Sequence, residues 1–272
     1  MCRVLEVSKS GYYKWKQTER TGIKQRDIFL IVKIKEISDQ SRNTYGSRRI
    51  TAKLRKEGIK VNIKRIIRLM KLVGIRAKTR RKFKITTNSN HKLSVARNLL
   101  KHIKEVTIIN MVWVGDITYI WTMEGWLYLA SVMDLYSRKI IGWCLGTRLD
   151  KELVVKALRM ALATRKIAFG LIFHSDKGSQ YASNEFKELL LQYGIIQSMS
   201  GKGRCYDNAF KESFFHTLKT ELVYHEYYKT RKEAEQSVFE YIEVFYNRQR
   251  IHSSINYMTP VEYELDLMKI LC

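Results

Sequence analysis

The sequence predicts a small all-α unit followed by an α/β unit that is built on a mixed five-stranded sheet with flanking helices. Two observations carry this prediction. Apolar residues recur at helical spacing in the first 77 residues, whereas strand-like runs begin near residue 111. Three of these runs follow one another through short connections and the later ones alternate with helices, which is the order expected of a mixed sheet.

Two short helices joined by a tight turn are predicted in the first unit. Ser47 can cap a helix over 48–57, and Gly58 can end it in a left-handed conformation. Asn62 can cap the next helix, which Gly74 ends. Such a pair is typical of a helix-turn-helix.

The second of these helices has an apolar face and a basic face. Its apolar residues recur at i, i+3, i+4 and i+7, and they are Ile63, Ile66, Ile67 and Met70. The basic residues on its other side are Lys64, Arg65, Arg68 and Lys71. We expect these four, with Arg48 and Arg49 of the preceding helix, to contact DNA. The alternative is an ordinary helical hairpin with a solvated basic face, and the local charge favours DNA.

Basic residues are concentrated in the first part of the chain. The 50 Lys and Arg residues outnumber the 26 Asp and Glu residues, and residues 1–105 contain 30 of the former against 7 of the latter. An excess of this kind is expected where a protein holds a polyanion. A basic surface that only aids solubility is the alternative. We predict a DNA-binding domain over 1–77 and a basic linker over 78–105.

Residues 106–272 are predicted to form the second domain, a core with a C-terminal helical extension. Its first three strands are consecutive runs joined by short turns, which indicates an antiparallel meander. The later elements are a helix over 151–166, strands over 171–176 and 195–200 with a helix between them, the helix of Glu212, and a helical region over 230–249. The only proline, Pro260, lies in the tail.

Three acidic residues of this domain form the candidate site. Asp116 lies inside a strand, Asp176 ends another strand, and Glu212 lies on a helix. Aspartate is depleted in strands, so function is favoured for Asp116. Asp176 also fits a turn before Lys177 and Gly178, and Glu212 taken alone has the pattern of a solvated surface residue.

The helix of Glu212 has one face for packing and another for the site. Its apolar residues, spaced by four, are Phe210, Phe214 and Leu218. His216 and Lys219 share the face of Glu212, because they follow it at i+4 and i+7. We expect Lys219 to be free to hold a phosphate.

Three carboxylates in so basic a chain suit hard divalent cations, which prefer oxygen ligands. Two Mg²⁺ ions, or Mn²⁺ in their place, held by Asp116, Asp176 and Glu212 are a recurring arrangement for phosphoryl transfer, and no covalent protein nucleophile is needed. Asp134 is a competing acid, which we expect to end its strand or to pair with Arg138.

Other classes of protein are disfavoured. The apolar runs are too short to span a bilayer, and the N-terminus lacks the apolar core of a signal peptide. The four cysteines are scattered, so neither a disulfide framework nor a zinc site is indicated. A glycosidase with paired carboxylates does not account for the basic first domain. We expect a cytoplasmic protein.

Four sequence strings carry a family resemblance. They are WVGDITY (113–119), FHSDKGSQYAS (173–183), SMSGKGRCYDNAFKESFFHTLKTEL (198–222) and YNRQRIHSSINYMTP (246–260). The 35 residues between Asp176 and Glu212 match the DD(35)E signature, and Lys219 matches the basic residue seven positions after its glutamate. The chain resembles the OrfB product of an insertion-sequence transposase of the IS-three family, with an integrase-type catalytic core.

The resemblance implies a ribonuclease H-like fold, two-metal catalysis, and cleavage and joining of DNA strands at the ends of the insertion sequence. It assigns Asp116, Asp176 and Glu212 as metal ligands and Lys219 as a DNA contact. It further implies a bacterial, nucleoid-associated protein that acts as a homo-oligomer on DNA, alone or fused to the product of an upstream frame. Gly115, where the family more often has a bulkier residue, departs from the pattern.

Two other functions remain open from the sequence. A stand-alone nuclease of the same fold would cut DNA without joining it. A catalytically inactive DNA-binding regulator would do neither, although the intact acid triad disfavours it. A retroviral-type integrase is disfavoured because no His/Cys zinc module precedes the core.

Overall fold

The chain divides into two compact units, Met1–Ala77 and Lys78–Cys272. The computed structural model describes residues 7–17, 25–78, 96–103, 105–167, 169–200 and 209–271. Most of the predicted linker over 78–105 lies outside these residues. No helix in the described ranges is long and apolar enough to cross a membrane.

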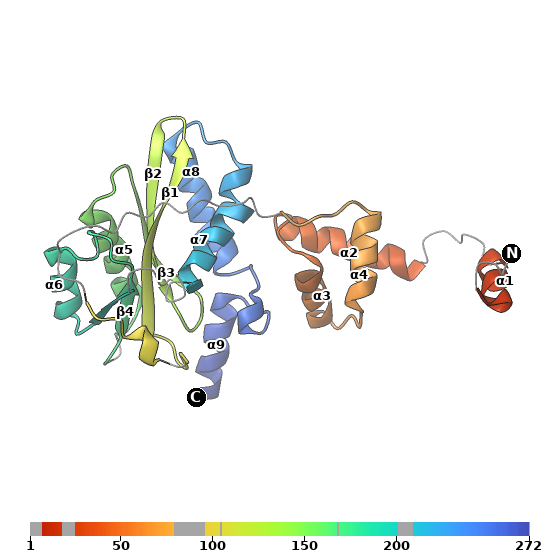
Figure 1. Cartoon of the computed structure of the whole chain (residues 1–272), viewed down its shortest axis with the longest axis horizontal. Coiled ribbons are helices and arrows are strands. Elements are labelled where there is room, and N and C mark those ends of the chain that lie inside the picture. The colour runs from red at the N-terminus through yellow and green to blue at the C-terminus, as the bar shows by residue number, and fades with distance from the viewer. Residues whose placement is uncertain are drawn as a thin grey trace. The chain divides into compact units, whose positions relative to one another are not determined.

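The first unit contains four helices in its described part (Figure 1). They are α1 (Lys9–Gln17), α2 (Gln25–Gln40), α3 (Ser47–Lys56) and α4 (Ile63–Leu72). The last three pack on one another through fully buried side chains, which include Ile34, Ile50, Leu54 and Ile66. Burial of this apolar surface supplies the free energy that orders three helices too short to be stable alone.

Most of the predicted helix ends are confirmed. The Asn62 side chain accepts a 2.8 Å hydrogen bond from the backbone N–H of Lys64, and Gly58 and Gly74 adopt left-handed φ angles of +79° and +72°. The prediction that Ser47 caps α3 is wrong. The cap residue is Gly46, which has no side chain to bond, and Ser47 is the first helical residue.

The predicted apolar stripe of α4 is also partly wrong. Ile66, Leu69 and Met70 are buried, whereas the Ile67 side chain is 50% exposed. The helix presents to α2 and α3 the face centred between Ile66 and Leu69, and Ile67 lies beyond the edge of that face. The outer surface of α4 is therefore mixed, with an apolar residue among its basic ones.

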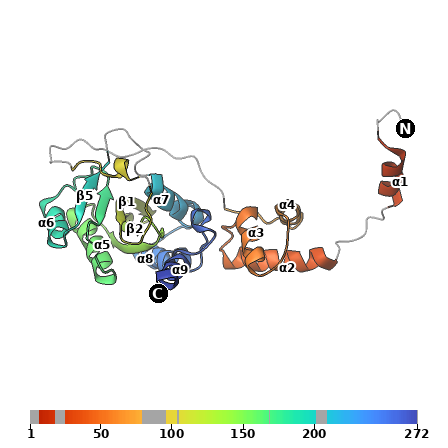
Figure 2. The same ribbon diagram turned by 90° about the horizontal axis from the view of Figure 1, so that it is seen from below.

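The second unit is built on the predicted mixed five-stranded sheet (Figures 1 and 2). Its strands are β1 (Val112–Thr122), β2 (Gly125–Asp134), β3 (Ile140–Gly146), β4 (Ile172–Ser175) and β5 (Ile196–Met199). They lie in the order β3-β2-β1-β4-β5, with β1, β2 and β3 antiparallel and β4 and β5 parallel to β1. The long β1 therefore occupies the centre.

Helices cover both faces of this sheet (Figures 1 and 2). One face carries α5 (Lys151–Thr164) and α6 (Asn184–Gln192), and the other carries α7 (Ala209–Glu221) and α8 (Arg231–Phe239), with α9 (Pro260–Leu271) at its lower end. Two separate buried apolar clusters fill the two interfaces. The result is a three-layer α/β/α unit.

The C-terminal region is helical, as predicted, and its helices differ in kind. The helical region over 230–249 is not one α-helix, because α8 gives way to a π-helical segment over Glu240–Tyr246. The tail also folds, and Pro260 begins α9, where its fixed φ and missing N–H suit the first turn of a helix. Short 3₁₀ helices occur at Leu100–His102, Val223–His225 and Ser253–Ile255.

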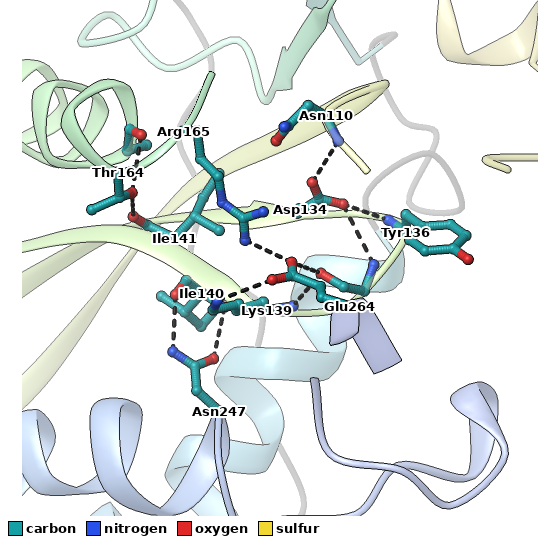
Figure 3. Close-up of polar contacts among 12 residues, drawn as sticks. Asn110, Asp134, Tyr136, Lys139, Ile140, Ile141, Thr164, Arg165, Asn247 and Glu264 are labelled. Atoms are coloured by element: carbon teal, nitrogen blue, oxygen red, sulfur yellow. Dashed lines mark hydrogen bonds and ion pairs between the residues drawn. The ribbon is translucent and has the colours of Figure 1, made fainter. Parts of the chain in front are cut away.

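Buried polar side chains fasten the C-terminal region to the sheet (Figure 3). The Asn247 amide accepts from the N–H of Ile140 and donates to its carbonyl, both at 2.9 Å, and so continues the ladder at the edge of β3. Glu264 of α9 accepts from Ser137, Lys139 and Arg165 at 2.6–3.0 Å. These three donors keep the pKa of the Glu264 carboxyl below its usual range although burial opposes them.

Asp134 ends β2, as predicted. Its carboxylate is fully buried and accepts hydrogen bonds from the backbone N–H groups of Asn110, Tyr136 and Ser137 (Figure 3). Burial raises the pKa of this carboxyl, and the donated N–H bonds oppose the shift. Asp134 therefore has a structural role that is separate from the candidate site.

Gly142 allows the close approach of α5 to β3, and Gly142→Ala should lower the free energy of unfolding by about 1–3 kcal/mol. A methyl group there would overlap the Ala157 carbonyl oxygen and lie 2.7 Å from the Ala161 nitrogen, and backbone atoms cannot yield. Gly146→Ala on the same strand is the control, because its nearest neighbour is a movable Leu153 methyl. Urea unfolding checks both, and equal losses would contradict this account.

Candidate active site

Asp116 lies within β1, and Asp176 directly follows β4, the parallel strand beside β1. Val114 of β1 pairs with His174 of β4, and each aspartate follows its member of that pair by two residues. Side chains two residues apart on a strand share a face, so the two carboxylates emerge at corresponding places. Both are half-buried. Burial raises the pKa of the Tyr181 hydroxyl, and the negative charges of Asp116 and Asp176 raise it further. The hydroxyl therefore lies near both carboxylates.

Local hydrogen bonds orient both carboxylates. Oδ1 of Asp176 accepts from the N–H of Gly178 at 3.0 Å, which confirms the turn predicted there. Oδ1 of Asp116 accepts from the N–H of Ile117 at 2.8 Å. A carboxylate has about four lone-pair sites, so a turn-forming aspartate can also bind a cation. The turn and the site are therefore compatible uses of Asp176.

Helix α7 carries Glu212 across the face of the sheet on which Asp116 emerges. Its buried residues Phe214, Phe215 and Leu218 join the apolar cluster that contains Val112 and Val114 of β1. The side chains of residues 209–213, including Glu212 and Phe210, lie outside the described part of the structure. The convergence of Glu212 with the two aspartates therefore stays a prediction.

Lys219 differs from the expectation that it is free at the surface. Its side chain is buried, and Nζ lies 4.4 Å from the centroid of the Tyr119 ring in a cation–π contact. Burial lowers the pKa of this lysine, and the charge of Asp116 opposes the shift. Lys219 thus lies between the candidate acid site and the outer part of β1.

Gly115, which departs from the family pattern, has a packing reason. A methyl group at this position would overlap Cζ of Phe173, lie 2.6 Å from its Cε1 and lie 3.1 Å from Cε1 of Tyr181. Those two rings occupy the space that a larger residue would need, and both are almost fully buried. Glycine at position 115 therefore allows the rings of Phe173 and Tyr181 to pack tightly beneath Asp116.

A buried ion pair fixes the C-terminal end of α7. Arg250 donates to both oxygens of Glu221 at 2.8 and 2.7 Å, and the Tyr241 hydroxyl donates to Oε2 at 2.8 Å. Lys78 donates to the Glu221 carbonyl at 3.0 Å. The carboxylate of Glu221 outweighs the effect of burial and raises the pKa of Arg250. Sequence reasoning missed this pair, since a glutamate on a helix ordinarily faces solvent.

The predicted DNA contacts of the first unit fall into two groups. Arg65 and Arg68 form ion pairs with Asp27 of α2 at 2.6 and 2.8 Å, and these contacts hold the pKa of that carboxyl below its usual range. The other group is Lys64, Lys71, Arg48 and Arg49. The first three are exposed, while the Arg49 guanidinium lies 5.6 Å from the centroid of the Tyr45 ring.

The donor set of the site fits a hard cation as far as it is described. No group of three or more His, Cys, Asp or Glu side chains is brought together among the described residues, and the predicted third ligand, Glu212, is not among those side chains. Two half-exposed carboxylates on rigid strands supply the oxygen ligands that Mg²⁺ prefers while leaving room for water and phosphate oxygens.

Known families match both units. Residues 24–83 match an HTH-like domain, and residues 107–205 and 212–266 match the integrase core domain. One chain of the simian T-cell lymphotropic virus intasome structure, a complex with PP2A regulatory subunit B56 gamma, matches 65% of this chain and 60% of its own length, with a TM-score of 0.50 and 18% identity. That likeness supports the fold alone.

Relatives with similar sequences cover almost the whole chain. The IS600 uncharacterized 31 kDa protein of Shigella sonnei is 48% identical over 263 residues, which is 97% of each chain. Transposase InsF of IS3A from Escherichia coli strain K12 is 42% identical over 267 residues, 97% of this chain and 92% of InsF.

The fold and these matches define an integrase core domain preceded by an HTH-like domain. The chain belongs to the IS3 family of insertion-sequence transposases. The resemblance of its four motifs to that family is thereby confirmed.

The Glu221–Arg250 pair can be tested by a double-mutant cycle with Glu221→Leu, Arg250→Met and the double variant. Each single change should lower the free energy of unfolding by about 3–5 kcal/mol, because it leaves a buried charge without its partner. The double variant should be much more stable than the sum of the losses implies. Urea unfolding followed by the combined fluorescence of the five tryptophans measures the cycle, and additive losses would refute the coupling.

Asp27→Asn should loosen α4 at neutral pH, because Arg65 and Arg68 lose their shared partner. Since the pKa of Asp27 is lowered on folding, its stabilising effect is present above the unfolded value near 3.8 and is lost as pH falls through the folded value. Amide hydrogen exchange in α4 should differ between the proteins at neutral pH and should converge only as the pH falls below 3.8 and through the lowered pKa of Asp27. Asp39→Asn, at an exposed site on α2, is the control.

Proposed function

We propose that this chain is the catalytic subunit of transposition, which cleaves DNA at the ends of its insertion sequence and joins them to a target. The observation that carries the proposal is the register of β1 and β4, in which Asp116 and Asp176 each follow a member of the Val114–His174 pair by two residues, with the Glu212 helix packed over the face of the sheet on which Asp116 emerges. In this reaction water attacks a phosphodiester at the element end, and the freed 3′ hydroxyl then attacks a second phosphodiester.

Asp116, Asp176 and Glu212 would hold two Mg²⁺ ions, with Mn²⁺ as the alternative. When bound, such a pair activates the attacking oxygen and stabilises the leaving one. The strands and the turn at Gly178 hold both aspartates in place before substrate binds, so little reorganisation is needed. Lys219 would contact a DNA phosphate after leaving the Tyr119 ring, or would neutralise charge at the site from its present place.

The first unit would bind DNA through its basic surface. Exposed Lys64, Lys71 and Arg48 are the best-placed phosphate contacts, and Arg49 can join them. Arg65 and Arg68 would contribute through the nitrogens that Asp27 does not occupy, since a guanidinium has five N–H donors. Phosphate contacts of this type fix position without reading sequence.

We retain the domain limits 1–77, 78–105 and 106–272 for the DNA-binding domain, the linker and the catalytic domain. The partners of such a subunit would be the element ends, the target DNA, further copies of the chain on that DNA, and an upstream-frame product as fusion or separate partner. Its place would be the bacterial cytoplasm, at the nucleoid.

Asp116→Asn, Asp176→Asn and Glu212→Gln should each reduce Mg²⁺-dependent cleavage of element-end DNA by about a thousand-fold or more while DNA affinity stays within about two-fold. Each change removes a ligand charge but keeps the side-chain size. Asp266→Asn, at an exposed position of α9, is the control. Gel assays of cleavage and of joining measure the outcome.

Near-wild-type cleavage by any of the three variants would remove that residue from the site. Cleavage by the wild type without joining would indicate a nuclease, and DNA binding without either reaction in Mg²⁺ or Mn²⁺ would indicate an inactive regulator.

A further inference from the structure

One face of the β1–β2 hairpin is lined with aromatic side chains. The strand register places Tyr119 opposite Tyr128 and Trp121 opposite Trp126. Residues that face each other across an antiparallel pair project from the same side of the sheet. Tyr119 and Trp121 each meet Trp126 edge to face, with ring centroids 5.0 and 4.8 Å apart. These four residues are called the aromatic face below.

The aromatic face points away from the core. The alternate residues of the hairpin, which include Ile120, Leu127 and Leu129, are fully buried in the cluster under α7 and α8. Trp121 and Trp126 keep 55% and 43% of their surface exposed. In Figure 1 the hairpin extends beyond α5, the helix that covers the lower part of the same sheet face. A solvent-facing side of an antiparallel pair is ordinarily polar, so this surface has another use.

The aromatic face meets the candidate active site at an edge of β1. Tyr119 follows Asp116 by three residues, about 10 Å along the strand, so the two side chains project from opposite faces of the sheet. The pairing of β4 with β1 ends at Val114, and beyond it Lys219 links the two faces, because its Nζ lies over the Tyr119 ring while its helix packs on the side from which Asp116 emerges. A DNA strand with a phosphate at Asp116 that crosses this edge would bring its neighbouring nucleotides to Tyr119 and then to the exposed indole rings of the aromatic face.

We propose that the aromatic face stacks against unpaired bases of the DNA strand next to the phosphate under attack, and so favours DNA whose end is opened. The inference rests on the proposed function, which makes DNA the substrate and places the attacked phosphate at Asp116. Stacking on aromatic rings is tolerant of sequence, because every base has a π-face. Opening a terminal pair costs free energy, and stacking on exposed indole rings offsets that cost.

The chemistry of the face favours bases over a protein partner. Its exposed members, Trp121 and Trp126, are flat aromatic rings held edge to face, and the half-buried Tyr119 beside them carries the ammonium of the buried Lys219. Aromatic rings next to a positive charge are typical of sites for single-stranded nucleic acid. The next exposed side chains at the hairpin end, Met123 and Tyr227, contact each other and extend the apolar surface by one further ring.

The test uses the full chain without divalent metal, so that binding is separated from cleavage. The probes are one duplex that carries 2-aminopurine at its last pair and the same duplex with its last few pairs mismatched. The variants are Trp121→Ala, Trp126→Ala and Trp121→Leu, the last of which keeps apolar volume but lacks a π-face. Tyr193→Ala is the matched control, since Tyr193 is an aromatic residue of the same unit with the same 43% exposure as Trp126.

The wild type and Tyr193→Ala should bind the opened duplex more tightly than the paired one and quench its 2-aminopurine. Each tryptophan variant, Trp121→Leu included, should lose about ten-fold in affinity for the opened duplex and keep its affinity for the paired one. Unchanged preference for the opened duplex in Trp121→Ala and Trp126→Ala would overturn the proposal. So would a change in sedimentation of those variants with no change in preference, which would assign the face to contacts between proteins.

The outcome is independent of the catalytic proposal. If the wild type prefers opened ends through its tryptophans but cleaves nothing in Mg²⁺ or Mn²⁺, the reaction assigned to the acids fails and the stacking face stands. If cleavage depends on the three acids while the tryptophan variants show no altered preference, the stacking face fails alone.

Discussion

The buried ion pair between Glu221 and Arg250 fixes the end of α7, the helix that carries the proposed third ligand, Glu212. It lies at the end of α7, nine residues after Glu212 on a continuous helix, and ties that helix to the segment that follows the π-helical turn. A buried pair of charges gains little over well-packed apolar residues in stability. Its value is in geometry, because the two-pronged contact admits one position of the helix along its axis. An apolar contact alone would tolerate sliding.

The same logic explains why the C-terminal region is folded around the sheet. Asn247 extends the edge of β3, and Glu264 collects three donors from the loops after β2 and α5. These contacts link residues that are 99 to 127 positions apart in the sequence. Each contact gives a hydrogen-bond partner to polar groups that would otherwise be buried without one. A region that looks like a tail in the sequence is therefore part of the support for α7 and, through it, for the site.

Local sequence patterns predicted the elements but not how they are held. The strands, the antiparallel meander of the first three and the ends of α4 follow from alternation and from Asn62 and Gly74, since these signals act within a few residues. The burial of Ile67 was mispredicted and the π-helical winding of Glu240–Tyr246 was not foreseen, because neighbouring helices decide which face is buried and where a helix changes winding. The strand position of Asp116 was predicted from the sequence, and so was that of Asp176, which directly follows β4. The partners Glu221 and Arg250 carry no local signal, so only the fold reveals them.

The two units differ in net charge, and therefore in how strongly they attract DNA over long range. Residues 106–272 contain 20 basic and 19 acidic residues, so long-range attraction to DNA comes almost entirely from the preceding part of the chain. In the proposed function, this nearly neutral unit brings a phosphate against carboxylates, and Asp116 and Asp176 would repel it locally. Contacts that do not depend on net charge, such as stacking on rings three to five residues along β1, are well suited to hold the strand there. The free energy of stacking should vary little with salt concentration, whereas the affinity of the basic unit for DNA should fall as salt concentration rises.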